Sequence, residues 1–342
     1  MAYIQVLSGL VLLGLAGDFL VRGSVLMARQ FNISPLIIGL TIVAFGTSAP
    51  ELAVSIDAVL AGVPTLALGN VVGSNIANTW LVLGVPVILS PMICNVPNIT
   101  KNLVIMIGVT VLFIAMAFMG PFTYINGFIL LTILAVFLWI SGKKATCLGE
   151  VKKTEGCDTL SDYELAISDI EGIPEKPDNF TVSTFLVIGG FAGLLFGALI
   201  LVEGSISVAR ELGVSEAVIG LTIVAIGTSI PELVTAIVAS LKGHCEVAIG
   251  NVIGSNIFNL LGIIGVSSLF GDINIPISFQ EQDLWIMLFA ALTLLPFAIM
   301  KCRIGRRAGI GFTSLYIFYI FNVAHSATHD NMTSTATMGL AS

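Results

Sequence analysis

The sequence predicts an all-α polytopic membrane protein of ten transmembrane helices, arranged as two inverted repeats of five helices. The first observation is composition: the 342 residues are 56% hydrophobic and 10% charged, with a mean hydropathy of +1.02. So few charged residues cannot cover the surface of a soluble globular protein. The second observation is a series of apolar runs, and the third is an internal repeat with one copy in each half of the chain.

Ten apolar runs approach the roughly 20 residues that a helix needs to cross a bilayer. They are 3–28, 35–60, 66–90, 102–119, 123–141, 182–209, 216–241, 247–270, 284–300 and 308–324. No basic segment or persuasive cleavage signal marks the first run as a signal peptide, so we expect it to be retained. Five runs in each half mean that the second half enters the membrane from the opposite side, which predicts an inverted repeat.

Two polar segments divide the chain. The first transmembrane half is 1–141 and the second is 181–324, and a cytoplasmic linker loop is expected over 142–180. This linker mixes nine acids with five lysines and contains prolines, which favours a solvated, partly disordered segment, and it lacks the spacing of an EF-hand loop. The small, polar stretch 325–342 predicts a disordered tail.

The distribution of basic residues predicts the orientation. Arg22 and Arg29 follow the first apolar run, which favours an outside amino terminus. Ten spans then place both termini outside the cell (inner) membrane and 13 of the 14 basic residues on the cytoplasmic side. The exception, Arg210, is equivalent to Arg29 in the repeat, so an inverted copy places it on the opposite face. All five cysteines fall on the reducing side, and no disulfide is expected.

The internal repeat relates 35–84, the first motif copy, to 216–265, the second motif copy. The two segments align without a gap, and 27 of 50 positions are identical. Each copy carries one carboxylate within its apolar run, Glu51 in the first and Glu232 in the second. A charged side chain at the centre of a membrane helix costs about 2.5–3.5 kcal/mol on insertion scales, so two at equivalent positions indicate a functional site.

A proline interrupts each motif copy. Pro50 and Pro231 remove a backbone donor and displace the carbonyl four residues earlier, so each helix should bend or break. We expect partly freed carbonyls near 44–47 and 225–228. In a membrane such carbonyls need a partner, and a cation is one.

Neutral oxygen atoms near the bends complete the predicted site. The contributing side chains are Thr47, Ser48, Ser74, Asn78, Thr228, Ser229, Ser255 and Asn259. Together with two carboxylates they form an all-oxygen set, which suits Ca²⁺ or several Na⁺ ions better than Mg²⁺. The three histidines lie in loops or the tail, which argues against a transition-metal site at membrane depth.

The segments GTSAPE and GTSIPE, each followed by GN-x-x-GSN-x-x-N, resemble the two α-repeats of the sodium/calcium exchanger family within the cation/calcium antiporter superfamily. The resemblance implies alternating access, in which Na⁺ and Ca²⁺ compete for overlapping sites and the first and sixth helices slide across the others. It implies a calcium site of Glu51 and Glu232 with the carbonyls of Thr47 and Thr228. It also implies sodium sites of the Ala44 and Ala225 carbonyls with Ser74 and Ser255, and a centre lined by Ser48, Ser229, Asn78 and Asn259.

Other interpretations stay open. Potassium-dependent relatives carry an aspartate where this chain has Asn259, so potassium co-transport is not expected. The same glutamates could carry protons in a Ca²⁺/H⁺ exchanger, or the chain could be a calcium channel or sensor module. The expected partners are Na⁺, Ca²⁺ and lipid, with no nucleic acid, no cofactor and no enzymatic reaction; the oligomeric state is not predicted. Asp18 and Arg22, four residues apart, predict a local ion pair.

Overall fold

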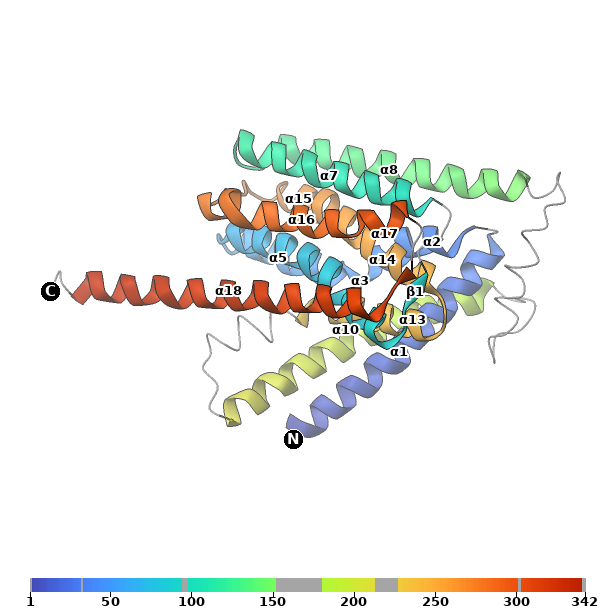
Figure 1. The fold of residues 1–342 in the computed structure, drawn as a ribbon, viewed down its shortest axis with the longest axis horizontal. Coiled ribbons are helices and arrows are strands. Elements are labelled where there is room, and N and C mark those ends of the chain that lie inside the picture. Colours follow the sequence, from blue (N-terminus) through green and yellow to red (C-terminus); the bar gives the residue numbers. More distant parts are fainter. Residues whose placement is uncertain are drawn as a thin grey trace.

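The protein is a bundle of long helices with one short two-stranded ribbon (Figure 1). A computed structural model describes residues 2–31, 33–93, 98–151, 180–212, 227–300 and 303–339. In the ribbon, β1 (Met92–Ile93) pairs antiparallel with β2 (Arg303–Ile304). This pairing joins the segment that follows the first motif copy to the segment that precedes the last helix.

The helices follow one another along the chain as follows, where η marks a π-helical segment. The first half contains α1 (Ala2–Gln30), α2 (Pro35–Ile38), η1 (Gly39–Val43), α3 (Ala44–Thr47), α4 (Ala49–Leu60), α5 (Pro64–Ala77), η2 (Asn78–Val82), α6 (Gly84–Leu89), α7 (Ile99–Met119) and α8 (Tyr124–Val151). The second half contains α10 (Phe180–Glu211), α13 (Ile230–Leu241), α14 (Cys245–Phe258), η4 (Asn259–Ile263), α15 (Ile264–Ser267), η5 (Phe279–Asp283), α16 (Leu284–Thr293), α17 (Leu295–Ile299) and α18 (Arg306–Gly339).

Seven helices in the described part of the chain are long and apolar enough to cross a membrane, and a bent pair adds an eighth candidate span. The protein is therefore a multi-pass helical membrane protein. Of the ten runs expected from the sequence, 216–241 is described only from residue 227 onward. The run 308–324 lies within α18, which is not among those seven helices.

The bend predicted at Pro50 is present. The segment Pro35–Thr47 meets Ala49–Leu60 at 43°. Pro50 occupies the first turn of α4, where its missing N–H removes no intrahelical hydrogen bond. Pro231 has the same place in α13, and the two residues before these helices have almost the same backbone angles: Ser48 has φ −85° and ψ 8°, and Ser229 has φ −88° and ψ 5°.

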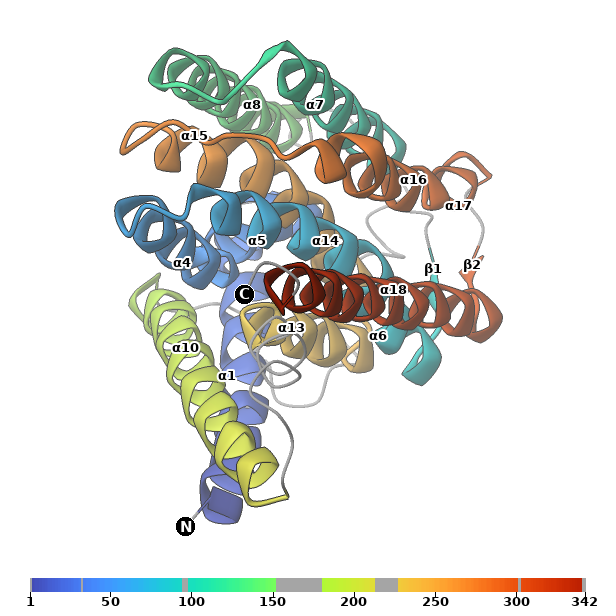
Figure 2. The same ribbon diagram turned by 90° about the vertical axis from the view of Figure 1, so that its left-hand side faces the viewer.

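Helices α1 and α10 pack tightly against each other through glycines (Figure 2). A Cβ atom on any of four glycines would lie within 2.9 Å of the other helix. The pairs are Gly9 with Leu201, Gly190 with Leu20, Gly23 with Val187, and Gly204 with Val6. The numbering decreases along one helix as it increases along the other, so the helices are antiparallel. Extending the alignment of the two motif copies to these helices makes the first pair equivalent to the second and the third equivalent to the fourth.

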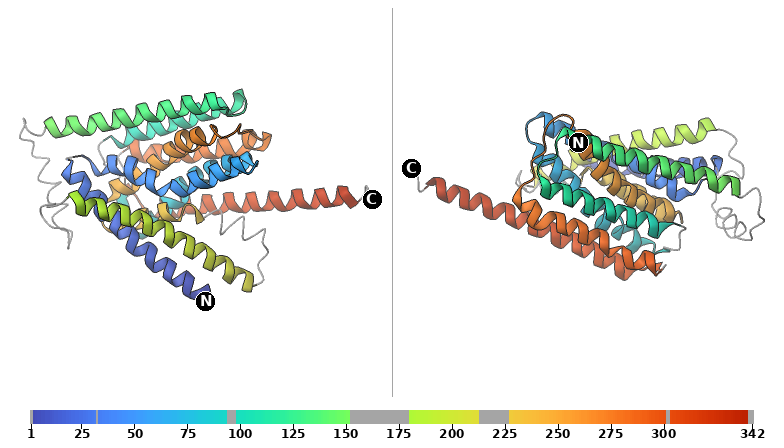
Figure 3. Two further views of the ribbon diagram at one scale, coloured as in Figure 1. Left: turned by 180° about the vertical axis from the view of Figure 1, so that it is seen from behind. Right: turned by 90° about the horizontal axis from the view of Figure 1, so that it is seen from above.

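The centre of the bundle is formed by the helices that follow the two bends. The span Cys245–Ser267 is 100% buried over its most apolar window and Pro64–Leu89 is 78% buried, against 22–44% for the other long spans. In the end-on view, α5 and α14 lie between the α7–α8 pair and the α1–α10 pair (Figure 2). The view from behind shows the same order of layers (Figure 3, left). Most side chains on α5 and α14 are thus shielded from lipid by the rest of the bundle.

Two helices run further than the sequence analysis expected. Helix α8 continues past residue 141 to Val151, into the expected linker, and α18 continues through the expected disordered tail to Gly339. Neither glycine nor proline occurs from 312 to 338, so no local signal ends α18 before Gly339. The remainder of the linker, 152–179, lies outside the described residues.

The predicted ion pair between Asp18 and Arg22 is confirmed. Arg22 Nε lies 2.8 Å from Asp18 Oδ2. Asp18 also forms an ion pair with Lys242, the residue that directly follows α13. This second contact ties α1 to the helix that carries Glu232.

Candidate cation site

Both predicted carboxylates are buried at the start of a short helix. Glu51 lies in the first turn of α4 and Glu232 in the first turn of α13, and each residue is only 1% exposed. The amino-terminal end of a helix carries a partial positive charge, which favours an anionic side chain there. Ser48, three residues before Glu51, donates a hydrogen bond to Glu232, so the starts of the two helices lie against each other. The fold thus brings together two acids from opposite halves of the chain.

Hydroxyl groups of the first motif copy reach across to the second. Ser48 Oγ donates a hydrogen bond to Glu232 Oε1 at 3.2 Å, and Thr47 Oγ1 lies 3.2 Å from Asn251 Oδ1, to which it donates. The Ala44 carbonyl accepts the Ser48 N–H at 3.1 Å and lies 3.4 Å from Thr47 Oγ1. These bonds place the bend before α4 directly against the acid of the other copy.

Several oxygen atoms of the predicted site are buried without a hydrogen-bond partner. They are Glu51 Oε2, Glu232 Oε2, Asn78 Oδ1, Asn259 Oδ1, Thr228 Oγ1, Ser229 Oγ and Ser255 Oγ. Leaving a buried polar atom unpaired costs about 1–3 kcal/mol, so native proteins contain few of them. These seven oxygens come from both motif copies, and a ligand that pairs with oxygen would satisfy them. A hard cation such as Ca²⁺ or Na⁺ has this chemistry.

The two predicted amide ligands begin π-helical segments. Asn78 is the first residue of η2 and Asn259 the first residue of η4, and both are buried. Such widened turns occur frequently at functional sites because they displace backbone and side chains from the regular helical register. The two π-helical segments could not be predicted from the hydrophobic pattern.

The remaining predicted residues differ in how deeply they are buried, and one of them is not described. Ser74, Ser255 and Ala44 are buried on α5, α14 and α3. Thr228 is half-buried in the break before α13, although its hydroxyl oxygen is fully covered. Ala225 lies outside the described residues. Its role as a carbonyl ligand stays a prediction.

The sequence analysis missed four asparagines that line the same region. They are Asn70, Asn75, Asn251 and Asn256. Asn70 Nδ2 donates to the Glu51 carbonyl at 3.1 Å and to Ser55 Oγ at 3.0 Å, which supports the turn that holds the carboxylate. A signal was present, because the GN and GSN segments place an asparagine at each position in both motif copies.

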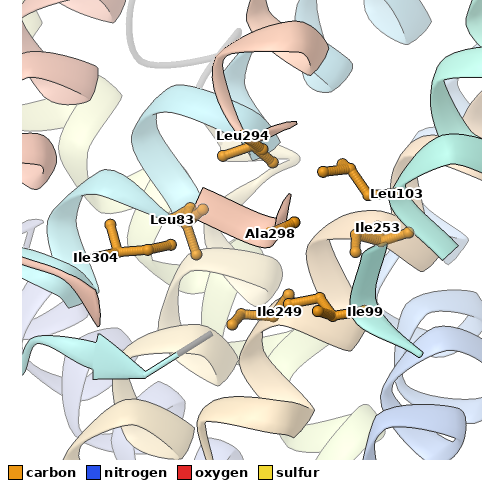
Figure 4. A pocket seen from close by; sticks show the side chains of 8 residues that line it. All are labelled: Leu83, Ile99, Leu103, Ile249, Ile253, Leu294, Ala298 and Ile304. Carbon is orange, nitrogen blue, oxygen red and sulfur yellow. The ribbon is translucent and has the colours of Figure 1, made fainter. Parts of the chain in front are cut away.

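Two cavities in the described part of the chain have apolar linings, which do not suit a cation. The first is lined entirely by aliphatic side chains in or next to α6, α7, α14, α17 and β2 (Figure 4). The second, about 300 Å³, lies between η1, α8 and α14, and Thr41 is the only lining residue with a polar side chain. Within the described ranges, no group of three or more histidine, cysteine or acidic residues could hold a metal ion. The oxygen set around the two glutamates is therefore the best candidate.

The chain is similar to known proteins over nearly its whole length. Residues 1–143 and 182–324 match the family described as "Sodium/calcium exchanger protein". CaxA of Alkalimonas amylolytica, named as an antiporter, is 38% identical over 89% of this chain and 91% of its own. Sodium/calcium exchanger MaX1 of Methanosarcina acetivorans is 34% identical over 93% of this chain and 97% of its own. A solved structure of the sodium-calcium exchanger NCX_Mj, soaked with zero Na⁺ and Ca²⁺, superposes with a TM-score of 0.78 at 32% identity, covering 94% of this chain and 98% of that one.

Proposed function

The chain belongs to the sodium/calcium exchanger protein family, and we propose that this Na⁺/Ca²⁺ antiporter binds both cations at the junction of its two motif copies. The observation that carries the proposal is the set of seven buried, unpartnered oxygens in the two motif copies, which includes one carboxylate oxygen each of Glu51 and Glu232. Two carboxylates balance one Ca²⁺, so neither acid is left as an uncompensated charge in low dielectric. The same oxygens can be divided among Na⁺ ions, which makes binding of the two cations mutually exclusive.

The proposed ligands come equally from both motif copies. Glu51 and Glu232 supply the charge that compensates Ca²⁺. Neutral oxygens complete the coordination and provide the flanking sodium positions; they come from Ala44, Thr47, Ser48, Ser74, Asn78, Ala225, Thr228, Ser229, Ser255 and Asn259. Of these, the Ala44 carbonyl already accepts a backbone hydrogen bond, so a cation there would use its second lone pair.

We further propose that the fold consists of ten transmembrane helices in two inverted five-helix repeats. The antiparallel packing of α1 and α10 supports this arrangement, because equivalent glycines contact equivalent residues of the other helix. In inverted repeats the ion site lies near the midplane between the copies, and exchange proceeds by moving one group of helices against the other. Helices α1 and α10 pack far more extensively against each other than against any other helix, and they are the proposed moving group.

The proposed orientation places both termini outside and the linker 142–180 in the cytoplasm of a cell (inner) membrane. The support is the basic residues: 13 of 14 fall on the cytoplasmic side in this arrangement. Protease treatment of right-side-out vesicles checks it. Cleavage within the linker under those conditions contradicts the orientation.

The decisive experiment is uptake of ⁴⁵Ca²⁺ into proteoliposomes preloaded with Na⁺, compared with vesicles preloaded with K⁺, choline or an acidic buffer. We expect uptake only with internal Na⁺, collapse by a sodium ionophore, and no uptake with Glu51→Gln. Asp57→Asn is the matched control, because Asp57 is an exposed acid on the same helix. It should transport like the wild type.

Each alternative gives a different outcome in this assay. Uptake driven equally by an outward proton gradient identifies a Ca²⁺/H⁺ exchanger that uses the glutamates as proton carriers. Calcium flux that is indifferent to every internal cation identifies a channel. Wild-type exchange in Glu51→Gln contradicts the site assignment while leaving the antiport intact.

A further inference from the structure

The amide of Asn259 has one satisfied end and one unsatisfied end. Its Nδ2 atom donates to Asn75 Oδ1 at 3.1 Å, while its Oδ1 atom is buried without a partner. An amide can rotate by half a turn and exchange these two ends. Only one orientation offers the cation an oxygen; the other would offer it two N–H groups.

The orientation of the Asn259 amide is fixed through Asn75 by the backbone carbonyl of Asn256. Asn75 Nδ2 donates to the main-chain oxygen of Asn256 at 3.3 Å. A carbonyl oxygen can only accept, so the Asn75 amide must turn its nitrogen toward Asn256 and its oxygen toward Asn259. Asn259 must then turn its nitrogen toward Asn75, which leaves its oxygen for the cation. The direction of each bond in this chain follows from the last acceptor.

A second chain of bonds runs the other way between the same two helices. Asn256 Nδ2 donates to Thr79 Oγ1 at 3.0 Å, and Thr79 Oγ1 donates to the main-chain oxygen of Asn75 at 3.0 Å. Asn75 and Asn256 are equivalent in the repeat, and each is thus connected to the other's backbone. This reciprocal connection holds α5 against α14, and the bond to the Asn256 carbonyl holds the Asn75 side chain in its orientation.

From these contacts we propose that Asn75 is a positioning residue, which holds the Asn259 amide with its oxygen toward the cation and thereby favours Ca²⁺ over Na⁺. The inference rests on the proposed function, because it assumes that Asn259 faces the transported ion. The preference follows from charge: the energy of an ion with an oriented dipole is proportional to the ionic charge. Loss of the orientation should therefore weaken Ca²⁺ binding more than Na⁺ binding.

Equilibrium ⁴⁵Ca²⁺ binding to the purified full-length protein, with Na⁺ as competitor, tests the proposal. Asn75→Leu keeps the side-chain volume but removes both hydrogen-bonding ends, and Asn75→Ala is a second variant should the first fail to fold. We expect Ca²⁺ affinity to fall about tenfold, equivalent to about 1.4 kcal/mol. Because the sodium ion carries half the charge, the affinity for Na⁺ should fall only about threefold.

A double-mutant cycle with Asn259→Ala separates positioning from general damage. If Asn75 acts through Asn259, adding Asn75→Leu to Asn259→Ala should cause no further loss. Additive losses, or wild-type affinity in Asn75→Leu, overturn the proposal. Thr110→Ala is the control for general damage, because Thr110 is buried on α7 and its hydroxyl donates within its own helix. An equal fall in the Ca²⁺ affinity of this control would also overturn the proposal. Wild-type protein that binds no calcium refutes the proposed function instead, which keeps the two failures distinct.

Discussion

The two motif copies are nearly the same in sequence but differ in their hydrogen bonds. In the first copy, the hydroxyl groups of Thr47 and Ser48 donate to Asn251 and Glu232 of the second. In the second copy, the equivalent hydroxyls of Thr228 and Ser229 have no hydrogen-bond partner among the residues that the structure describes. Glu232 is consequently held by the opposite copy.

The contacts of the bends with helix α10 also differ. A Cβ atom at Gly46 would collide with the ring of Phe191, whereas at Gly227 it would meet a single methyl group of Val202 at 2.7 Å. Both contacts are made by α10, although α1 is its equivalent in the repeat. If the two inverted copies had identical conformations and contacts, the site would be open to both sides of the membrane or to neither. An asymmetric arrangement is therefore what an alternating-access exchanger should show in either end state.

The largest expected effect concerns what the copies share. Glu232→Gln should abolish Na⁺-driven ⁴⁵Ca²⁺ uptake as completely as Glu51→Gln, because each removes half of the charge that compensates Ca²⁺. Both proteins should still insert and elute as folded species in size-exclusion chromatography. Residual uptake in one variant alone contradicts an equal division of charge between the copies.

The second prediction addresses the bends. Gly46→Ala should destabilise the protein by about 1–3 kcal/mol, the usual cost of overpacking, because the new methyl group meets the Phe191 ring. Gly227→Ala should cost less, since one methyl group of Val202 can move aside. Thermal unfolding in detergent measures both. In a Phe191→Ala background, Gly46→Ala should cost much less than in the wild type, whereas the cost of Gly227→Ala should not change. An unchanged cost of Gly46→Ala in that background would show that Phe191 is not the obstacle.

The third prediction concerns the two serines. In cation-free buffer, Ser48→Ala should lower the free energy of unfolding by about 1 kcal/mol, because it deletes the hydrogen bond to Glu232. Ser229→Ala should leave it unchanged or slightly raised, because its hydroxyl is buried without a partner. Denaturant titration of the purified proteins separates the two. Equal effects would remove the asymmetry between the copies.

The smallest effect is expected at Lys242, whose equivalent in the first copy is Ala61. Lys242→Ala removes the ion pair with Asp18, and both side chains are 23% exposed, so the loss should stay below about 1 kcal/mol. The difference from wild type should shrink in concentrated choline chloride, which screens charges without supplying Na⁺. A loss that is independent of salt contradicts an electrostatic origin.

The sequence by itself determined the membrane class and the twin motif, because composition and the repeat are properties of the chain alone. Runs of apolar residues located the seven described helices that are long enough to cross a membrane, and Pro50 located the bend that the structure shows at 43°. The run of residues without glycine or proline before Gly339 was equally visible, yet the polar composition of 325–342 led to the expectation of a disordered tail where α18 continues. Composition describes solvation, whereas the end of a helix depends on local stop signals.

Only the tertiary structure decided which atoms of the site are paired. Ser48 and Ser229 stand in the same local sequence, so no rule based on neighbouring residues can assign a partner to one and none to the other. The relay from Asn259 through Asn75 to Asn256 joins two helices that lie far apart in the chain. Its direction depends on a backbone carbonyl whose position is set by packing. Repetition in the sequence made the site symmetric in composition, and the contacts between the copies made it asymmetric in structure.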